Sequence, residues 1–365
     1  MKTVSWKEQL RRGMTSAAAL CEKLPQLAPQ RPMLDAVTAT YPLLINSYVA
    51  DMLRQPGDPL WRQFVPDAAE IEDSCGMDDP LAEDSHAPVP NITHRYPDRV
   101  LFLVSNRCAV HCRFCTRKRK IGRTFDVTPA TIAQGIDYIA RSPGVRDVLL
   151  SGGDPLLLPT AQLAGILERL RAIAHVHIIR IGTRVPGVLP ERVTSGLART
   201  LARAQPLYVN THFNHPVEIT PQAYRACSRL ADAGIPLGCQ TVLLKGVNDS
   251  VEVMRRLMQG LLDMRVRPYY LHHMDYTRGT AHFRTSLTTG LEIMRALRGH
   301  CSGMGVPHYV IDLPGGGGKV PLSPGYIRGV DGQALLIRNF QGKMFRYEIC
   351  PQDVETFAAC RGLCP

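Results

Sequence analysis

The sequence predicts an α/β fold organised as a partial TIM-like (βα) barrel. From residue 99 onward, apolar runs rich in β-forming residues alternate with stretches of helical periodicity, at roughly thirty residues per unit. The apolar runs are continuous, which is typical of parallel strands covered by helices. In such barrels the chemistry gathers at the C-terminal ends of the strands, and the polar motifs of this chain follow predicted strands directly.

The barrel region is expected to alternate between strands and crossover helices. The strands are predicted at residues 100–104, 145–150, 176–181, 207–211, 236–244, 268–271 and 306–311. The helices are predicted at residues 129–140, 161–174, 221–233, 251–264 and 287–299. This order of elements predicts one parallel sheet covered on its outside by the helices.

The segments on either side of the barrel have a different pattern. Residues 1–93 are predicted to form an N-terminal helical extension without strands, with helical spacing of apolar residues in 4–23 and 33–53. Residues 94–320 are expected to form the catalytic barrel. Residues 321–365 are expected to carry short β segments at 334–339 and 343–347, followed by a cysteine-containing tail.

Composition limits the classes of protein to be considered. The chain has 365 residues, 45% hydrophobic and 21% charged, as in a soluble globular protein. The sequence shows no secretory leader and no apolar run of roughly 20 residues, and its eleven cysteines are odd in number. These features predict a cytoplasmic protein without a membrane partner. The net charge of +11 includes the run Arg117-Lys118-Arg119-Lys120. Without a nucleic-acid-binding motif, this run predicts a solvated face or the rim of an anion site rather than a nucleic-acid partner.

Three cysteines at C-x3-C-x2-C spacing are the most specific chemical signal. Cys108, Cys112 and Cys115 follow the first predicted strand of the barrel. Three thiolates can hold three irons of a [4Fe-4S] cluster and leave the fourth iron free to bind S-adenosylmethionine (SAM) for radical chemistry. A zinc knuckle that adds His111 is the alternative, but it lacks a second pair of ligands at a suitable spacing.

Two loops with glycines follow other predicted strands. Ser151-Gly152-Gly153-Asp154 ends the strand at 145–150, where glycines let a ligand approach the backbone and Asp154 can accept from an ammonium group. A simple turn is the alternative reading of that loop. Lys319 follows four consecutive glycines and could bind pyridoxal phosphate (PLP) as a Schiff base, the alternative being a surface turn with a solvated lysine.

Taken together, these motifs resemble the lysine 2,3-aminomutases, a family of radical-SAM enzymes that also carry PLP. The matching stretches occur in chain order at residues 94–99, 108–119, 148–154, 180–184, 210–216, 244–249, 267–270 and 312–319. The resemblance implies a partial barrel of the radical-SAM type. It also implies three cofactors, namely a [4Fe-4S] cluster, SAM and PLP.

The matching positions imply individual roles. The resemblance implies that Cys108, Cys112 and Cys115 ligate the cluster and that Lys319 holds PLP. The remaining cofactor contacts that it implies are Arg95 and Arg99 at PLP, Ser151, Gly152, Gly153 and Asp154 at the amino group of SAM, and His212 and Gln240 facing SAM or the cofactor phosphate.

The substrate contacts that the resemblance implies favour a cationic amino acid. Arg117 matches the arginine that binds the substrate carboxylate, and Asp275 and Asp312 match two aspartates that bind the side-chain ammonium of lysine. Two buried carboxylates repel each other unless a cation lies between them. The expected reaction is therefore the isomerisation of L-lysine to β-lysine, unless the two aspartates only begin a loop and cap a turn.

Other functions remain open from the sequence. Arginine would also satisfy Arg117 and the two aspartates. Short relatives that make β-lysine for attachment to a translation elongation factor usually lack the glycine run 315–318 that this chain has. A PLP-free radical-SAM enzyme that modifies RNA or protein, and a non-enzymatic iron–sulfur or zinc module, are further alternatives.

The C-terminal tail departs from the longer family members, which bind zinc there with the help of a cysteine after residue 249. Here that position is Ser250, and Cys350, Cys360 and Cys364 have a different spacing. Zinc binding and the homo-oligomer that it supports in relatives are therefore left open. The cluster chemistry implies a reductant partner such as flavodoxin or ferredoxin.

Overall fold

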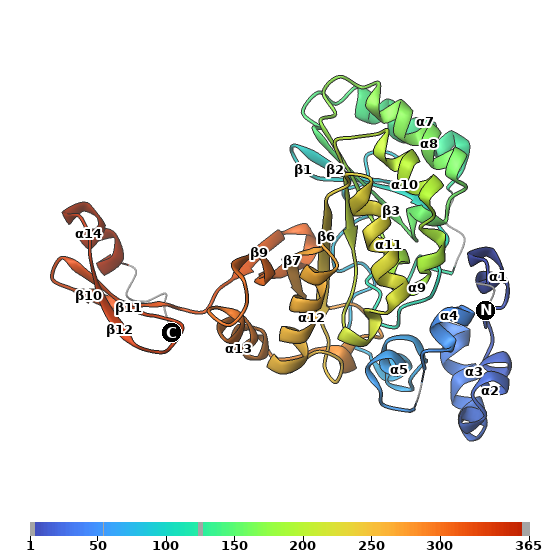
Figure 1. The fold of residues 1–365 in the computed structure, drawn as a ribbon, viewed down its shortest axis with the longest axis horizontal. Coiled ribbons are helices and arrows are strands. Elements are labelled where there is room, and N and C mark those ends of the chain that lie inside the picture. Colours follow the sequence, from blue (N-terminus) through green and yellow to red (C-terminus); the bar gives the residue numbers. More distant parts are fainter. Residues whose placement is uncertain (1–3, 54, 123–126, 360–365) are drawn as a thin grey trace.

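The computed structural model describes residues 4–53, 55–122 and 127–359. Its centre is a nine-stranded sheet in which each strand lies beside the previous one along the chain. The parallel strands are β2 (Arg99–Ser105), β3 (Asp147–Gly152), β4 (Ile178–Gly182), β5 (Leu207–Thr211), β6 (Leu237–Leu243), β7 (Arg267–His273) and β8 (His308–Leu313). The sheet curves into an incomplete barrel (Figure 1), which confirms the predicted fold class.

The two edges of the sheet are antiparallel strands. β1 (Ile92–Tyr96) pairs with β2, and β9 (Gly318–Leu322) pairs with β8. A side-chain contact links these edges, because the hydroxyl of Tyr96 accepts a hydrogen bond from the backbone N–H of Lys319 at 3.0 Å.

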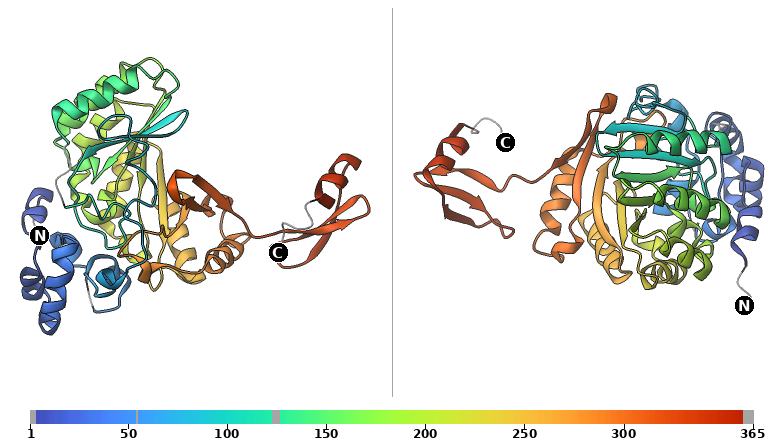
Figure 2. Two further views of the ribbon diagram at one scale, coloured as in Figure 1. Left: turned by 180° about the vertical axis from the view of Figure 1, so that it is seen from behind. Right: turned by 90° about the horizontal axis from the view of Figure 1, so that it is seen from above.

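Helices cover the outer face of the sheet (Figures 1 and 2). They are α7 (Pro129–Ala140), α8 (Thr160–Arg171), α9 (Val185–Val188), α10 (Ser195–Ala202), α11 (Pro221–Asp232), α12 (Val251–Asp263) and α13 (Leu287–Leu297). Several begin where a hydroxyl accepts from a backbone N–H of the first turn, as Thr128 does for α7 and Ser250 for α12. Ser250 is thus the N-cap of α12. Within the described residues no helix is long and apolar enough to span a membrane.

The strands expose different side chains on their two faces. In β3, Val148 and Leu150 are fully buried, while Asp147, Leu149 and Ser151 between them line the interior of the barrel. Such alternation is the expected period of a strand, and here it places apolar residues under the helices. The inward face is left for polar side chains, so the barrel encloses a cavity rather than a packed core.

The N-terminal extension consists of short helices that pack against the barrel (Figure 1). They are α1 (Trp6–Arg11), α2 (Ala17–Lys23), α3 (Arg31–Thr40), α4 (Ser47–Ala50), α5 (Pro59–Phe64) and α6 (Ala69–Glu72). The two long helical stretches predicted at 4–23 and 33–53 are each broken once, near Gly13 and near Pro42. Buried residues of the extension, such as Leu34 and Phe64, belong to the same hydrophobic cluster as the barrel core.

Three strands were not predicted. The expectation of no strand within residues 1–93 is wrong, because β1 begins at Ile92. Its side chains are mostly polar and half-buried, so it forms because β2 offers a free edge rather than because of its own pattern. β9 was not predicted because a run of glycines, which are depleted in strands, leads into it. β10 (Ile327–Asp331) was not predicted either, and it precedes the two predicted C-terminal segments.

The C-terminal arm, residues 327–359, projects away from the barrel (Figures 1 and 2). β10 pairs with β11 (Ala334–Arg338), which pairs with β12 (Met344–Glu348), and α14 (Pro351–Ala359) follows. The two predicted β segments are therefore confirmed. Every residue of β12 is exposed, including Phe345 and Tyr347.

Candidate active site

The inward faces of the strands and the loops at their C-terminal ends enclose a cavity of about 860 Å³. Every site residue predicted from the sequence lines this cavity. They are Arg95, Arg99, Cys108, Cys112, Cys115, Arg117, Ser151, Gly152, Gly153, Asp154, His212, Gln240, Asp275, Asp312 and Lys319. A cavity of this size lies at the upper end of the range for ligand pockets, so it has room for more than one small molecule.

The cysteine loop is held by the N-terminal extension. The backbone N–H of His111 donates to the carbonyl of Leu44 at 2.8 Å, and that of Arg113 donates to the carbonyl of Gln63 at 2.9 Å. The Nδ1 atom of His111 lies 3.0 Å from the carbonyl oxygen of Pro42, so its ring is engaged with this extension. The extension therefore forms the wall behind the predicted cluster.

The three thiols are chemically suited to a cluster. Burial raises the pKa of Cys108 well above its ordinary value, and it raises the pKa of Cys115 to about 11, with the nearby cysteines adding to both shifts. Neutral thiols are the favoured form until a cation compensates their charge. Within the described residues no three side chains are gathered as a preformed metal site, but the three cysteines line one cavity. Three soft sulfur donors on one loop match the ligand set of an iron–sulfur cluster, so the donor set fits that group.

A buried ion cluster ties the cysteine loop and the residues just after it to α6. Glu70 of α6 accepts from the Nε and Nη2 atoms of Arg113 and from the Nζ atom of Lys118, the last at 2.6 Å. Lys118 also donates to the carbonyl of Gly279, after β7. Burial alone would raise the pKa of Glu70, but the charges of Arg113 and Lys118 outweigh burial and lower it.

The whole basic run that follows the cysteines is paired with acidic residues of the N-terminal extension. Beyond the Glu70 contact of Lys118, these pairs are Arg117 with Glu83, Arg119 with Asp79 and Asp84, and Lys120 with Asp84. Lys118 is only 6% exposed. The solvated face, one of the two predictions for this run, is therefore wrong, since the charges of the run are paired within the chain. The other, the rim of an anion site, stays a prediction.

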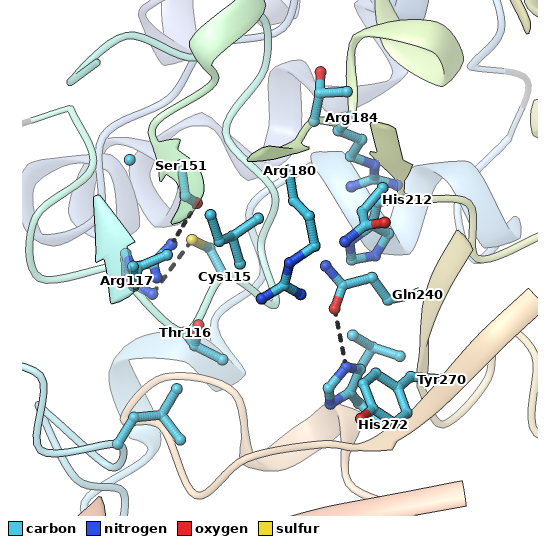
Figure 3. Close-up of a pocket in the computed structure, with 18 of the residues that line it drawn as sticks. Cys115, Thr116, Arg117, Ser151, Arg180, Arg184, His212, Gln240, Tyr270 and His272 are labelled. Atoms are coloured by element: carbon cyan, nitrogen blue, oxygen red, sulfur yellow. Dashed lines mark hydrogen bonds between the residues drawn. The ribbon is translucent and has the colours of Figure 1, made fainter. Parts of the chain in front are cut away.

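Glu83 holds Arg117 in one orientation. The Nε and Nη2 atoms of Arg117 contact the Glu83 carboxylate at 2.8 and 2.7 Å, while its Nη1 atom lies 3.3 Å from the Oγ of Ser151 (Figure 3). One edge of the guanidinium is thus occupied, and the Nη1 end is directed along the cavity wall. A guanidinium can bind a second carboxylate there. Sequence reasoning missed Glu83, although the acidic segment 78–84 was a signal that a basic partner exists.

The glycines at the end of β3 and just after it are required by the cysteine loop itself. A Cβ on Gly152, whose φ is +124°, would lie 2.1 Å from the carbonyl oxygen of Ser105. A Cβ on Gly153 would lie 2.3 Å from that of Arg107. The N–H groups of Gly153 and Asp154 donate to these two carbonyls at 2.6 and 2.7 Å. The loop thus packs directly on the start of the cysteine loop.

Asp154 ties this loop to the end of β4. Its carboxylate accepts from the hydroxyl of Thr183 at 2.8 Å, from the backbone N–H of Arg184 at 2.8 Å and from that of Leu156 at 3.0 Å. Burial raises the pKa of Asp154 to about 6 despite these hydrogen bonds. The predicted contact with the amino group of SAM stays a prediction.

The four glycines before Lys319 form the turn of a hairpin rather than a flexible tether. Gly315, Gly316 and Gly318 have φ values of 68°, 83° and 91°, which only glycine adopts without strain. The turn joins β8 to β9 and places Lys319 directly across from Asp312. Their Nζ and Oδ2 atoms lie 2.6 Å apart.

Asp275 and Asp312 differ in protonation although they lie close together. Burial would raise the pKa of Asp312, but His272 and the Lys319 ammonium outweigh it and hold that pKa at about 2. Burial and the negative charge of Asp312 raise the pKa of Asp275 to about 7. The Oδ1 atom of Asp312 is buried without a hydrogen-bond partner, so it can accept from a further donor.

Basic and aromatic side chains surround Lys319. Arg95 lies 3.6 Å from the Oδ1 atom of Asp312, and the guanidinium carbon of Arg99 is 3.9 Å from the ring centre of Tyr96. Tyr96 had no predicted role, although it stands between these two arginines in the sequence. A lysine amine in a cavity that two guanidinium groups also line suits PLP, whose aldehyde needs an amine and whose phosphate needs cations.

His212 and Gln240 lie on the opposite wall from Arg117 (Figure 3). The Nε2 atom of His212 contacts Asn214, and burial lowers the pKa of His212 well below its ordinary value, so its ring is neutral. Gln240 contacts the Nε2 atom of His272 at 3.1 Å, and the Nδ1 atom of His272 lies 3.6 Å from Asp312. A polar chain thus runs from this wall to Asp312.

Family comparisons agree with this site. The model of the radical SAM superfamily matches residues 102–258, and a model described as lysine-2,3-aminomutase matches residues 294–360. The L-lysine 2,3-aminomutase of Fusobacterium nucleatum is 50% identical over 84% of this chain and 73% of its own length. That of Clostridium subterminale is 44% identical over 94% of this chain and 83% of its own.

A relative with another substrate is only slightly more distant. The glutamate 2,3-aminomutase of Clostridioides difficile is 40% identical over 94% of this chain and 82% of its own length. The identity of the substrate therefore has to be argued from the residues of the site, whereas these matches are enough to show the family. With the cysteine loop, the lysine hairpin and these matches, the chain belongs to the lysine 2,3-aminomutase family of radical-SAM enzymes.

Proposed function

We propose that this protein converts L-lysine to β-lysine by moving the amino group from C2 to C3. The observation that carries the proposal is that Asp275 and Asp312, two carboxylates whose charges interact, line the same cavity as Arg117. A zwitterionic amino acid with a cationic side chain complements both features. Glutamate would bring a third carboxylate to the acidic pair, at a cost in electrostatic repulsion.

The shared cavity supports the cofactor residues that the resemblance implies. Cys108, Cys112 and Cys115 would hold the cluster, with SAM between them and the wall of His212 and Gln240. Lys319 would hold PLP, with Arg95 and Arg99 in the same cavity as cations for its phosphate. When bound, the cluster and SAM supply a radical that takes hydrogen from the substrate, and PLP supplies the π-system that delocalises the resulting electron.

The protein's own residues bind, orient and shield. The reaction breaks the C2–N bond, forms the C3–N bond and moves one hydrogen from C3 to C2, so it is redox-neutral overall. Arg117 would fix the carboxylate end of lysine, and Asp275 and Asp312 would fix the ammonium end. Fixing both ends holds C2 and C3 in one place, which is the contribution that positioning makes to such a rearrangement.

A substrate panel tests the proposal. The anaerobically reconstituted enzyme is given lysine, arginine, ornithine and glutamate, and β-amino acid products are measured by mass spectrometry. Lysine is expected to be the best substrate. Turnover of glutamate but not of lysine would contradict the role of the acidic pair. Preference for arginine would mean that the same residues bind a cationic side chain longer than that of lysine.

The alternative of a PLP-free modifying enzyme makes a different prediction. The wild-type protein with PLP should show the absorbance of a Schiff base, and Lys319→Ala should lose it. Lys343→Ala is the matched control, because Lys343 lies in the C-terminal arm. An absorbance that persists in Lys319→Ala would remove Lys319 from the PLP site.

Partners and location are further parts of the proposal. We propose a cytoplasmic enzyme whose cluster receives electrons from a low-potential donor such as flavodoxin or ferredoxin. The exposed strand β12, with Phe345 and Tyr347, supports a homo-oligomer formed through the arm. Light scattering of Tyr347→Glu against wild type tests whether the homo-oligomer forms through this strand.

Of the tail cysteines, Cys360 and Cys364 lie outside the described residues. Cys350 is exposed and contacts Asp353 at 2.9 Å.

A further inference from the structure

A buried arginine without a predicted role contacts one of the cluster cysteines. The Nη1 atom of Arg184, just after β4, donates to the Sγ atom of Cys112 at 2.7 Å. Arg184 is 8% exposed and lies between two aromatic rings, 4.7 Å from the centre of Phe64 and 5.0 Å from that of Phe114. Figure 3 shows the guanidinium beside His212 in the wall of the cavity.

A network of fully buried polar groups holds the guanidinium in place. Its Nη2 atom donates to the Oε1 atom of Gln63 at 2.6 Å and to the Oε2 atom of Glu218 at 3.1 Å. The Oε1 atom of Glu218 accepts in turn from Gln63 and from the backbone N–H groups of Asn214 and His215. Both partners are therefore fixed by other hydrogen bonds, and Arg184 has little freedom to move away from the sulfur.

The backbone of Arg184 links the same point to the loop after β3. Its N–H donates to Asp154, whose own N–H donates to Arg107 at the start of the cysteine loop. One residue thus connects the end of β4, the loop predicted to meet SAM, and the sulfur of Cys112. The sulfur of Cys115 accepts only a longer contact, 3.4 Å from the backbone N–H of Arg117.

We propose that Arg184 is a positioning residue that raises the reduction potential of the cluster through Cys112. Reduction adds one negative charge to the cluster and its sulfur ligands. A charged N–H donor stabilises the reduced form more than the oxidised form, because hydrogen bonds to ligand sulfurs and nearby charge set cluster potentials. Arg184 therefore eases the electron transfer that precedes SAM cleavage. Glu218 partly offsets the positive charge, so it acts in the opposite direction.

The test is an EPR-monitored redox titration of the reconstituted cluster without SAM or substrate. Because the inference rests on a cluster bound by Cys108, Cys112 and Cys115, iron and acid-labile sulfide are measured first. Absence of a cluster in the wild type would contradict the cluster assignment rather than the role of Arg184. Arg184→Met is expected to lower the midpoint potential, and Arg184→Lys is expected to restore part of the loss because it keeps a cation.

Two more variants separate this role from general damage. Glu218→Gln keeps a hydrogen-bond acceptor but removes the negative charge, so the potential should rise. Arg192→Lys alters a 2% exposed arginine that donates to the carbonyls of Leu156 and Leu158, and it should leave the potential unchanged. An unchanged potential in Arg184→Met, or a shift of Glu218→Gln in the same direction, would overturn the proposal. If Arg184→Met cannot hold a cluster, the direction in which Glu218→Gln shifts the midpoint potential decides whether the proposal stands.

Discussion

Lys319 and Asp312 are cross-strand partners in the β8–β9 hairpin, with their charged atoms 2.6 Å apart. In the protein without PLP, Lys319, which is proposed to hold PLP, is thus paired with Asp312, whose carboxylate is proposed to bind the substrate ammonium. A lysine bound to PLP is no longer a free ammonium that Asp312 can pair with. Loading of the cofactor is therefore expected to free Asp312 for the substrate.

Asp312→Asn should weaken lysine binding while leaving the cluster intact. Loss of a charge-assisted hydrogen bond is expected to raise the KM for lysine about 10- to 100-fold. Steady-state kinetics and the iron content of the variant are the measurements. Asp78→Asn, which alters an exposed pair with Arg278, is the control and should leave KM unchanged. An unaltered KM in Asp312→Asn would remove this residue from the substrate site.

Lysine binding should depend on pH through Asp275. Its pKa is about 7 in the protein alone, raised by burial and by the charge of Asp312 and lowered by the charge of Lys319. Because PLP removes the Lys319 ammonium, the carboxylate that attracts the substrate forms only above that value, and the KM for lysine is expected to fall as the pH rises above about 7. In Asp275→Asn this fall should disappear, and a fall that persists would assign it to another group.

The same shift has a consequence for stability. The pKa of Asp275 is higher in the folded protein than its ordinary value of 3.8, so unfolding releases a proton between these values. The contribution of Asp275 to the free energy of unfolding therefore decreases as the pH rises toward 7, and it decreases no further above pH 7. Asp275→Asn should be more stable than wild type at about pH 8, by roughly 1–4 kcal/mol in urea titrations.

Glu83→Gln should affect substrate binding although Glu83 is not proposed to touch the substrate. Its carboxylate orients Arg117 through two contacts, and an amide would leave the guanidinium less well fixed. The KM for lysine should rise by roughly 5- to 50-fold, with a smaller effect on kcat. Asp84→Asn, which changes an exposed neighbour paired with Arg119 and Lys120, should alter KM by less than about twofold. Equal effects of the two variants would argue against a specific role for Glu83.

Glu70→Gln should destabilise the protein and loosen the cysteine loop. It leaves Arg113 and Lys118 buried without a counter-charge, which is expected to cost about 3–5 kcal/mol. Denaturant unfolding at neutral pH measures the loss, and reconstituted iron content reports on the loop. Because the pKa of Glu70 is lowered from 4.5, its contribution is present above that value and falls as the acid protonates, so the difference between variant and wild type should shrink in acid.

Gly152→Ala should prevent the loop after β3 from packing on the cysteine loop. The added Cβ would meet the Ser105 carbonyl oxygen at 2.1 Å, and the backbone has a φ that alanine rarely adopts. We expect a drop in the unfolding temperature and reduced cluster retention. Gly165→Ala is the matched control, because it lies in α8 with open space around its Cβ, and it should be neutral or stabilising by about 0.5–1 kcal/mol. Normal cluster retention in Gly152→Ala would show that the contact is dispensable.

Local patterns in the sequence were enough for the barrel, the cysteine triplet and the two glycine loops, whereas the other predicted site residues came from the resemblance to the family. Helix α7 and strand β5 have the bounds that periodicity predicted, because their apolar spacing and caps act between near neighbours. The spacing of Cys108, Cys112 and Cys115 likewise belongs to one short loop. Since parallel strands present their C-terminal ends at one rim, it followed that the cysteine loop and the loop at Ser151 would lie close together.

Only the tertiary structure decided which charges meet. Arg113 and Glu70 are 43 residues apart, and Arg184 and Cys112 are 72 apart, on segments that no periodic pattern connects. Their pairing depends on how the N-terminal extension packs against the barrel rim. The sequence by itself determined that a basic run follows the cysteines, but not that this run is buried, and a buried charge is stable only with a partner. The packed fold determined that the partners are acids of the extension, and that Arg184 faces a cluster cysteine.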